Sequence, residues 1–116
     1  MRSMKATMTH NPACQTSRNV LAILRDKGIE PVIIEYLKTL LSRAQIAALV
    51  QQTGAPVRDI VRKKEALYSE LELENASDEQ LFDAMAQHPV LLNRPIVTTP
   101  KGTKLCRPSE TVAELL

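Results

Sequence analysis

The order of strand and helix patterns along the chain restricts its possible folds more than any other feature. Residues 5–9 form a short strand candidate, and a helical pattern follows that ends at Gly28. Thr16 or Ser17 can cap this helix, and residues 31–36 then form a strand rich in β-branched side chains. A strand, a helix and a strand within roughly 30 residues make a βαβ unit with parallel strands.

The middle of the chain carries helical patterns only. Ser42 with Gln45, and Ser77 with Gln80, have the spacing of a capping box, in which each side chain bonds to the backbone of the other residue. Both pairs are followed by apolar residues at helical intervals. We therefore expect a helical insertion over about residues 40–92.

The last quarter of the chain returns to strand patterns. Residues 96–99 and 103–106 flank the turn sequence Pro-Lys-Gly, which is typical of a β-hairpin, and Ser109 can cap a last helix. The order βαβ, helical insertion, ββα predicts an α/β fold with a small mixed sheet of about four strands. The length of 116 residues predicts a single domain, residues 1–116.

Composition excludes several classes of protein. No stretch approaches the ~20 apolar residues of a membrane span, and the first residues lack the apolar core of a signal peptide. Two cysteines supply neither a disulfide scaffold nor a four-ligand zinc site, and 3% aromatic residues give no stacking platform for nucleic acid. We expect a cytoplasmic protein with reduced thiols, without membrane or nucleic-acid partners.

Charge is unevenly distributed, although the formal net charge is only +2. Residues 65–93 carry seven carboxylates and no Lys or Arg, whereas residues 1–25 and 94–107 carry basic residues and no acids. One interpretation is a solvated acidic helix face beside ordinary basic loops. The other is a cationic site built from the two ends of the chain, which would attract a small anion.

Cys14 lies at the predicted junction between the first strand and the first helix. The N-terminus of a helix offers unpaired N–H groups and partial positive charge, which favour a thiolate. His10 and Arg18 would act in the same direction if they face the sulfur. The alternative is a small buried hydrophobe, the common fate of a free cysteine, but the neighbouring residues are of loop and cap types.

Four separated segments resemble the glutaredoxin-coupled arsenate reductase family. They are HNPACQTSRN at 10–19, VRDIVRKK at 57–64, NRPIV at 93–97 and LCRPSE at 105–110. The resemblance runs from about residue 5 to the last residue and keeps the order of the segments. It implies a thioredoxin-like fold with a helical insertion, in agreement with the order of elements.

The resemblance also implies a set of site residues. The nucleophilic cysteine of the family falls on Cys14, and the residues thought to keep it ionised fall on His10 and Ser17. The three arginines that bind the oxyanion fall on Arg62, Arg94 and Arg107. Such guanidinium groups stay charged and present planar forks of donors that match a tetrahedral oxyanion. The resemblance further places a cis-proline at Arg94-Pro95.

The implied reaction reduces arsenate to arsenite through a Cys14 thiol–arsenate adduct. Glutathione acts as co-substrate, glutaredoxin restores the thiol, and the protein binds no cofactor and no metal. A monomer is expected. Cys106 is expected to be a packing cysteine that does not form a disulfide with Cys14.

Two alternatives remain open at this point. Another glutathione-dependent thiol reductase of the same fold would not need three arginines to bind an anion. A non-enzymatic transcriptional regulator resembling Spx would carry Cys-x-x-Cys at this turn, where the present chain has Ser17 as the fourth residue.

Overall fold

The computed structural model describes residues 4–116, which form two compact parts. One part contains the chain up to Thr39 together with Arg94–Leu116, and the other contains Leu40–Asn93. The second part matches the segment expected as a helical insertion. That all 116 residues make one domain stays a prediction.

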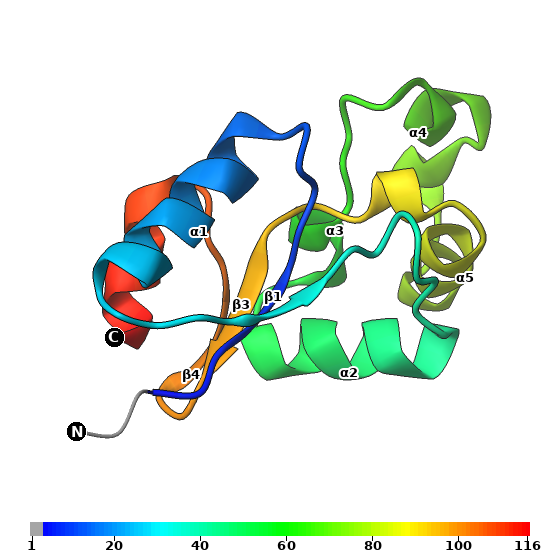
Figure 1. The fold of residues 1–116 in the computed structure, drawn as a ribbon. Helices are drawn as coiled ribbons and strands as arrows, with labels where there is room; N and C mark the ends of the chain where they lie inside the picture. The colour runs from blue at the N-terminus through cyan, green and yellow to red at the C-terminus, as the bar shows by residue number, and fades with distance from the viewer. Residues whose placement is uncertain (1–3) are drawn as a thin grey trace. The chain divides into compact units, whose positions relative to one another are not determined.

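The first part is built on a four-stranded mixed sheet in the order β2-β1-β3-β4 (Figure 1). Its strands are β1 (Thr7–Thr9), β2 (Val32–Ile34), β3 (Ile96–Thr99) and β4 (Gly102–Leu105). β1 is parallel to β2, while β1 with β3 and β3 with β4 are antiparallel. The predicted α/β class, the βαβ unit and the hairpin are therefore confirmed.

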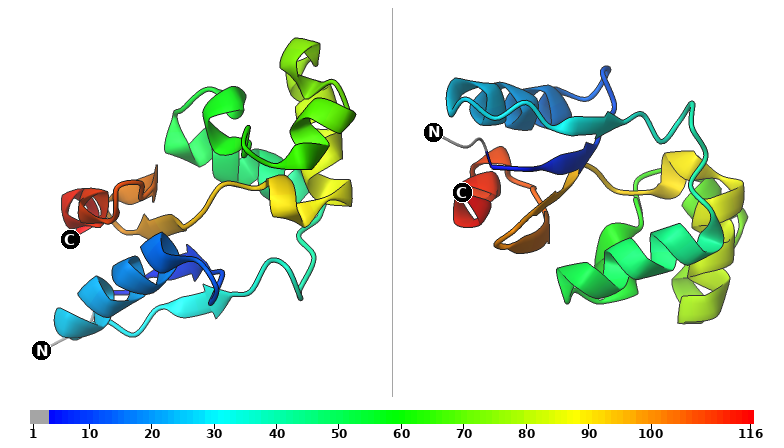
Figure 2. Two further views of the ribbon diagram at one scale, coloured as in Figure 1. Left: turned by 90° about the horizontal axis from the view of Figure 1, so that it is seen from above. Right: turned by 60° about the horizontal axis from the view of Figure 1, so that its bottom comes forward.

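One face of this sheet carries the core of the first part. Met8 and Val97 are paired across β1 and β3, and both are completely buried. They pack with the apolar face of α1 (Gln15–Asp26) and with Val112 and Leu115 of the 3₁₀ helix η3 (Ser109–Leu115). Figure 2 shows α1 in blue and η3 in red, which contact each other beside the strands.

Helix α1 begins earlier than the capping pattern predicts. Cys14 occupies the N-cap position with an extended backbone, and the first helical bond runs from the Arg18 N–H to the Cys14 carbonyl at 3.0 Å. Both predicted caps, Thr16 and Ser17, lie inside the first turn of the helix, and the Ser17 hydroxyl group bonds to His10. The cysteine thus lies closer to the helix N-terminus than expected.

The C-terminal segment is a 3₁₀ helix and not the expected α-helix. Its first position is Ser109, with Pro108 at the N-cap position. A seven-residue segment offers few α-helical bonds, and the Leu115 carbonyl accepts a bond of 2.7 Å from the Thr99 hydroxyl of β3. That bond ties the end of the chain to the sheet.

The second part contains short helices only. They are α2 (Arg43–Thr53), α3 (Val57–Ile60), α4 (Ala66–Glu70), η1 (Leu73–Asn75), α5 (Asp78–Gln87) and η2 (Pro89–Leu91). Both predicted capping boxes are present, at the starts of α2 and α5. Gly54 ends α2 with a φ of 70°, the left-handed conformation that glycine adopts without strain.

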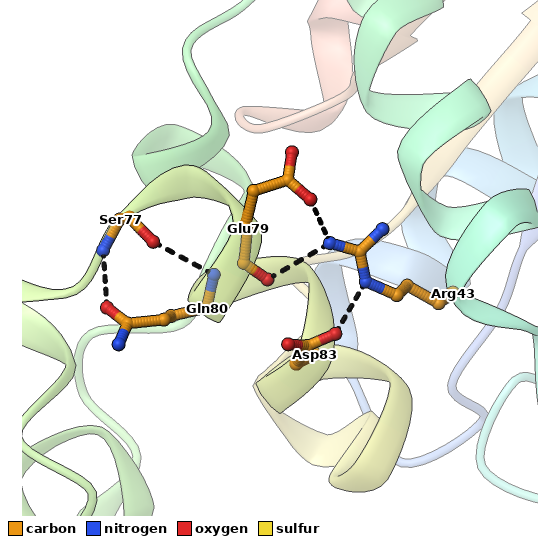
Figure 3. A network of polar contacts seen from close by, with 5 residues as sticks. All are labelled: Arg43, Ser77, Glu79, Gln80 and Asp83. Atoms are coloured by element: carbon orange, nitrogen blue, oxygen red, sulfur yellow. Dashed lines mark hydrogen bonds and ion pairs between the residues drawn. The ribbon is translucent and has the colours of Figure 1, made fainter.

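Arg43 of α2 joins that helix to α5 (Figure 3). Its guanidinium group bonds to the carboxylates of Glu79 and Asp83, and it lies 5.6 Å from the centre of the Phe82 ring. Three residues of one helix are therefore held by a single side chain of another. Within residues 4–116, no helix is long and apolar enough to cross a bilayer.

The capping box of α5 gives a direct test of local stability. Replacing Ser77 by Ala removes the acceptor for the Gln80 N–H, now bonded at 3.2 Å. We expect the free energy of unfolding to fall by ~1 kcal/mol, measured by urea denaturation with circular dichroism. Ser69→Ala, at an exposed position of α4, should change it by less than about 0.5 kcal/mol. Equal losses in both variants would contradict the assignment.

Candidate active site

Cys14 lies between the end of β1 and the first turn of α1, where the loop is folded by a tight turn. The Asn11 side chain accepts the Ala13 N–H at 3.0 Å, and the Asn11 carbonyl accepts the Cys14 N–H at 2.9 Å. Asparagine favours such turns because its side chain imitates a backbone acceptor. The sequence signal for the turn, Asn-Pro, is present, but Asn11 itself was not among the predicted site residues.

The guanidinium group of Arg107, which follows Cys14 by 93 residues, lies next to the Cys14 sulfur. Its Nη1 atom lies 3.8 Å from Sγ of Cys14 and also donates to the Arg94 carbonyl oxygen at 3.0 Å. Arg107 is exposed and Arg94 is buried. The structure therefore collects Cys14 and two of the three predicted arginines at one place in the first part.

These surroundings lower the pKa of the Cys14 thiol below its usual value. Burial is the largest single influence and raises the pKa, because it disfavours the charged form. The Ser17 backbone N–H in the first turn of α1 opposes it, together with the guanidinium groups of Arg107 and Arg94. Together the stabilising groups outweigh burial, so the thiolate is more accessible than in a free cysteine.

His10 contacts Ser17 in the first turn of α1, and its pKa lies below its usual value. Its Nδ1 atom lies 2.6 Å from the Ser17 hydroxyl oxygen, which also accepts the Asn11 N–H at 3.1 Å. Burial is the main cause that lowers the pKa of His10, so the imidazole is neutral. The Ser17 hydroxyl group therefore links His10 and the Asn11 backbone to the first turn of α1.

Arg18 does not serve the thiol as the sequence suggested. Its guanidinium group donates to the Pro12 carbonyl at 2.8 Å and to the Gln15 side chain at 2.7 Å. The side chain therefore closes the loop around the start of α1. Its charge also contributes to the lowered pKa of His10.

Arg62 belongs to the second part of the molecule. Its backbone N–H bonds to the Leu91 carbonyl at 2.7 Å, beside the bridge between Val61 and Leu92. Its Nη1 atom lies 2.6 Å from a carboxylate oxygen of Glu65. The role expected of Arg62 in binding an oxyanion stays a prediction.

Cys106 has the opposite environment to Cys14. It follows β4, is completely buried and packs in the core with residues of α1 and η3. Burial raises the pKa of its thiol to about 12. The side chain is therefore protonated at neutral pH and unreactive as a nucleophile.

The arrangement is suited to attack on an anion. A thiolate supplies the nucleophile, and guanidinium groups beside it offset the repulsion between two negative species. The Arg94-Pro95 peptide bond is cis, as expected, and so is Arg107-Pro108. Among the described residues, 4–116, no cluster of His, Cys, Asp and Glu could hold a metal ion.

Comparison with known proteins agrees with this description. The chain is 51% identical over 115 residues to an arsenate reductase of Rhizobium meliloti, covering 97% of this chain and 82% of the relative. It is 51% identical over 112 residues to one of Escherichia coli K12, covering 95% and 79% of the two chains.

The solved structure of an arsenate reductase from Vibrio cholerae superimposes with a TM-score of 0.94 at 44% identity, covering 99% of this chain and 100% of the other. The predicted thioredoxin-like fold is thereby confirmed. Residues 9–115 match the ArsC family. This chain, matched from the last residue of β1 to the last residue of η3, therefore belongs to the ArsC family.

Proposed function

We propose that this protein is an arsenate reductase in which Cys14 is the nucleophile. The observation that carries the proposal is the contact of 3.8 Å between Arg107 Nη1 and the Cys14 sulfur, beside Arg94. A disulfide substrate would need no cation at that place, whereas an oxyanion does. The relatives named above, which share about half of their residues with this chain, are arsenate reductases.

In the first step the Cys14 thiolate attacks arsenic. A sulfur–arsenic bond forms, an arsenic–oxygen bond breaks, and the oxygen leaves as water after protonation. Arsenic remains As(V) in this adduct. Arg94 and Arg107 stabilise the negative charge that the sulfur and the arsenate oxygens bring together.

In the second step glutathione supplies the electrons. Its thiolate attacks the Cys14 sulfur, a disulfide forms, and the electron pair of the sulfur–arsenic bond stays with arsenic, which leaves as arsenite. Two thiols are thus oxidised while As(V) becomes As(III). Glutaredoxin and further glutathione then reduce the mixed disulfide and return the Cys14 thiol.

Arg62 is proposed as the third group that binds the oxyanion. The proposal rests on its place in the segment VRDIVRKK, which resembles the corresponding family segment, and on the fork of donors that arginine offers. The Glu65 carboxylate now bonds to this guanidinium group at 2.6 Å. Arsenate would compete with that carboxylate for the same donors.

The proposed cycle also defines the setting of the enzyme. It runs on thiols alone, so no bound cofactor is required, and it needs the reducing conditions that the cytoplasm provides. We propose a cytoplasmic monomer, as the sequence predicts.

The lowered pKa of Cys14 predicts the pH dependence of its alkylation. Only the thiolate reacts, so the rate for the folded protein should reach half of its plateau below the value of ~8.5 typical of a free thiol. Iodoacetamide labelling of Cys106→Ala, which keeps Cys14 as the single thiol, measures this midpoint. The same protein in urea is the control. An identical midpoint in both conditions would refute the assigned environment.

The two cysteines should differ in their effect on turnover. In an assay that couples arsenate reduction to NADPH through glutathione reductase and glutaredoxin, Cys14→Ser should be inactive. Cys106→Ala should stay within about threefold of the wild type, because its thiol takes no part, and should lose roughly 1–2 kcal/mol of stability through the lost packing. An inactive but folded Cys106→Ala variant would disprove the single-thiol mechanism.

Arginine should not be replaceable by lysine at the anion site. Arg94→Lys, Arg107→Lys and Arg62→Lys should each lower kcat/KM for arsenate at least ~10-fold, because a point charge does not reproduce a planar fork. Lys63→Ala removes an exposed cation next to Arg62 and serves as the control for charge alone. Unchanged kcat/KM in the three lysine variants would show that positive charge alone suffices and would contradict the role of the planar fork.

A further inference from the structure

We propose that Thr9 is a positioning residue that holds the Arg94–Ile96 segment, and through it the two guanidinium groups, in place beside Cys14. The inference rests on the proposed function for its meaning in catalysis. Its structural basis is a contact between the end of β1 and the start of β3.

That contact joins a side chain to a backbone group. The Thr9 hydroxyl oxygen accepts the Ile96 N–H at 2.9 Å, and both residues are 1% exposed. The ladder between β1 and β3 pairs Thr7 with Thr98 and Met8 with Val97, and it stops there. The hydroxyl group of Thr9 therefore supplies an acceptor for the next N–H group of β3, where no further backbone pair is formed.

The Ile96 N–H belongs to the peptide group that follows Pro95. The other end of this peptide group, the Pro95 carbonyl, accepts the Cys106 N–H at 2.9 Å. One peptide plane is thus held at both ends, by the backbone after β4 and by Thr9. Of these two hydrogen bonds, only the one to Thr9 involves a side chain. A substitution at Thr9 can therefore remove it without changing the backbone.

Two contacts connect this peptide plane to the Cys14 sulfur. Pro95 directly follows Arg94, and the Arg94 carbonyl accepts Nη1 of Arg107 at 3.0 Å. The same Nη1 atom lies 3.8 Å from Sγ of Cys14. A rotation of the Pro95–Ile96 peptide plane would move Arg94 and, with it, the carbonyl that holds Arg107 against the sulfur.

Thr9 itself is placed firmly enough to act in this way. It pairs with Ile34 in the parallel ladder, and the next N–H, that of His10, bonds to the Ile34 carbonyl at 2.9 Å. The backbone on both sides of the Thr9 side chain is therefore fixed by β2. Its hydroxyl group presents a rigid acceptor to β3.

The experiment compares two substitutions that separate the hydroxyl group from side-chain packing. Thr9→Val keeps the shape but leaves the buried Ile96 N–H without its acceptor, whereas Thr9→Ser keeps the acceptor. Thr99→Val is the matched control: Thr99 is also buried in the sheet, and its hydroxyl bonds at the far end of β3, to the Leu115 carbonyl. KM for arsenate and the midpoint pH of Cys14 alkylation are measured for each variant.

For Thr9→Val we expect KM to rise roughly 10-fold and the alkylation midpoint to move toward that of the unfolded chain, because displaced guanidinium groups bind the anion and the thiolate less well. Thr9→Ser should keep KM within about twofold of the wild type, and Thr99→Val should change neither value while lowering stability. A folded Thr9→Val variant with both values of the wild type would overturn the proposal.

If Thr9→Val does not fold, the Thr9→Ser variant tests the role of the hydroxyl group. Wild-type KM and midpoint in that variant support the role of the hydroxyl group, and a changed midpoint overturns it. The alkylation measurement uses no arsenate, so it separates this proposal from the proposed function. A wild-type protein that fails to reduce arsenate refutes the function and leaves the comparison of midpoints valid.

Discussion

The contact between Arg107 and the Cys14 sulfur is the interaction on which the site depends. A thiol beside a helix terminus and below the surface experiences two opposing influences, since burial favours the neutral form and N–H groups favour the anion. The Arg107 guanidinium group lowers the pKa of the Cys14 thiol and so favours the thiolate. The same positive charge attracts an oxyanion, so in the proposed reaction the activation of the nucleophile and the attraction of the substrate have one cause.

The topology of the sheet explains how residues so distant in sequence meet. A parallel β1–β2 pair with its crossover helix places Cys14 beyond the end of the first strand. The antiparallel hairpin of β3 and β4 begins and ends with arginine-proline pairs, Arg94-Pro95 before it and Arg107-Pro108 after it. The two ends of a β-hairpin lie side by side, so a single hairpin next to β1 places the guanidinium groups of Arg94 and Arg107 near each other.

Local patterns predicted the elements that depend on neighbouring residues, whereas the meeting of Cys14, Arg94 and Arg107 was predicted only through the family resemblance. The capping box of Ser42 is local, because its partner lies three residues away, and it is present as expected. The helix α1 starts before the predicted caps, Thr16 and Ser17, since Cys14 occupies the N-cap position without a side-chain capping bond and the Ser17 hydroxyl group bonds to His10, seven residues away. Thr9 went unnoticed since its partner, Ile96, lies 87 residues further along the chain. No local pattern encodes such a bond.

The deep burial of Cys106 has a consequence for how the protein meets oxidants. Its thiol stays protonated among apolar side chains, and the chain contains only these two cysteines. In the proposed cycle, an oxidised Cys14 therefore depends for its recovery on thiols outside its own chain, those of glutathione and glutaredoxin. The fraction of active protein would then follow the redox state of the cellular thiol pool, so that the catalyst also reports on the supply of its own reductant.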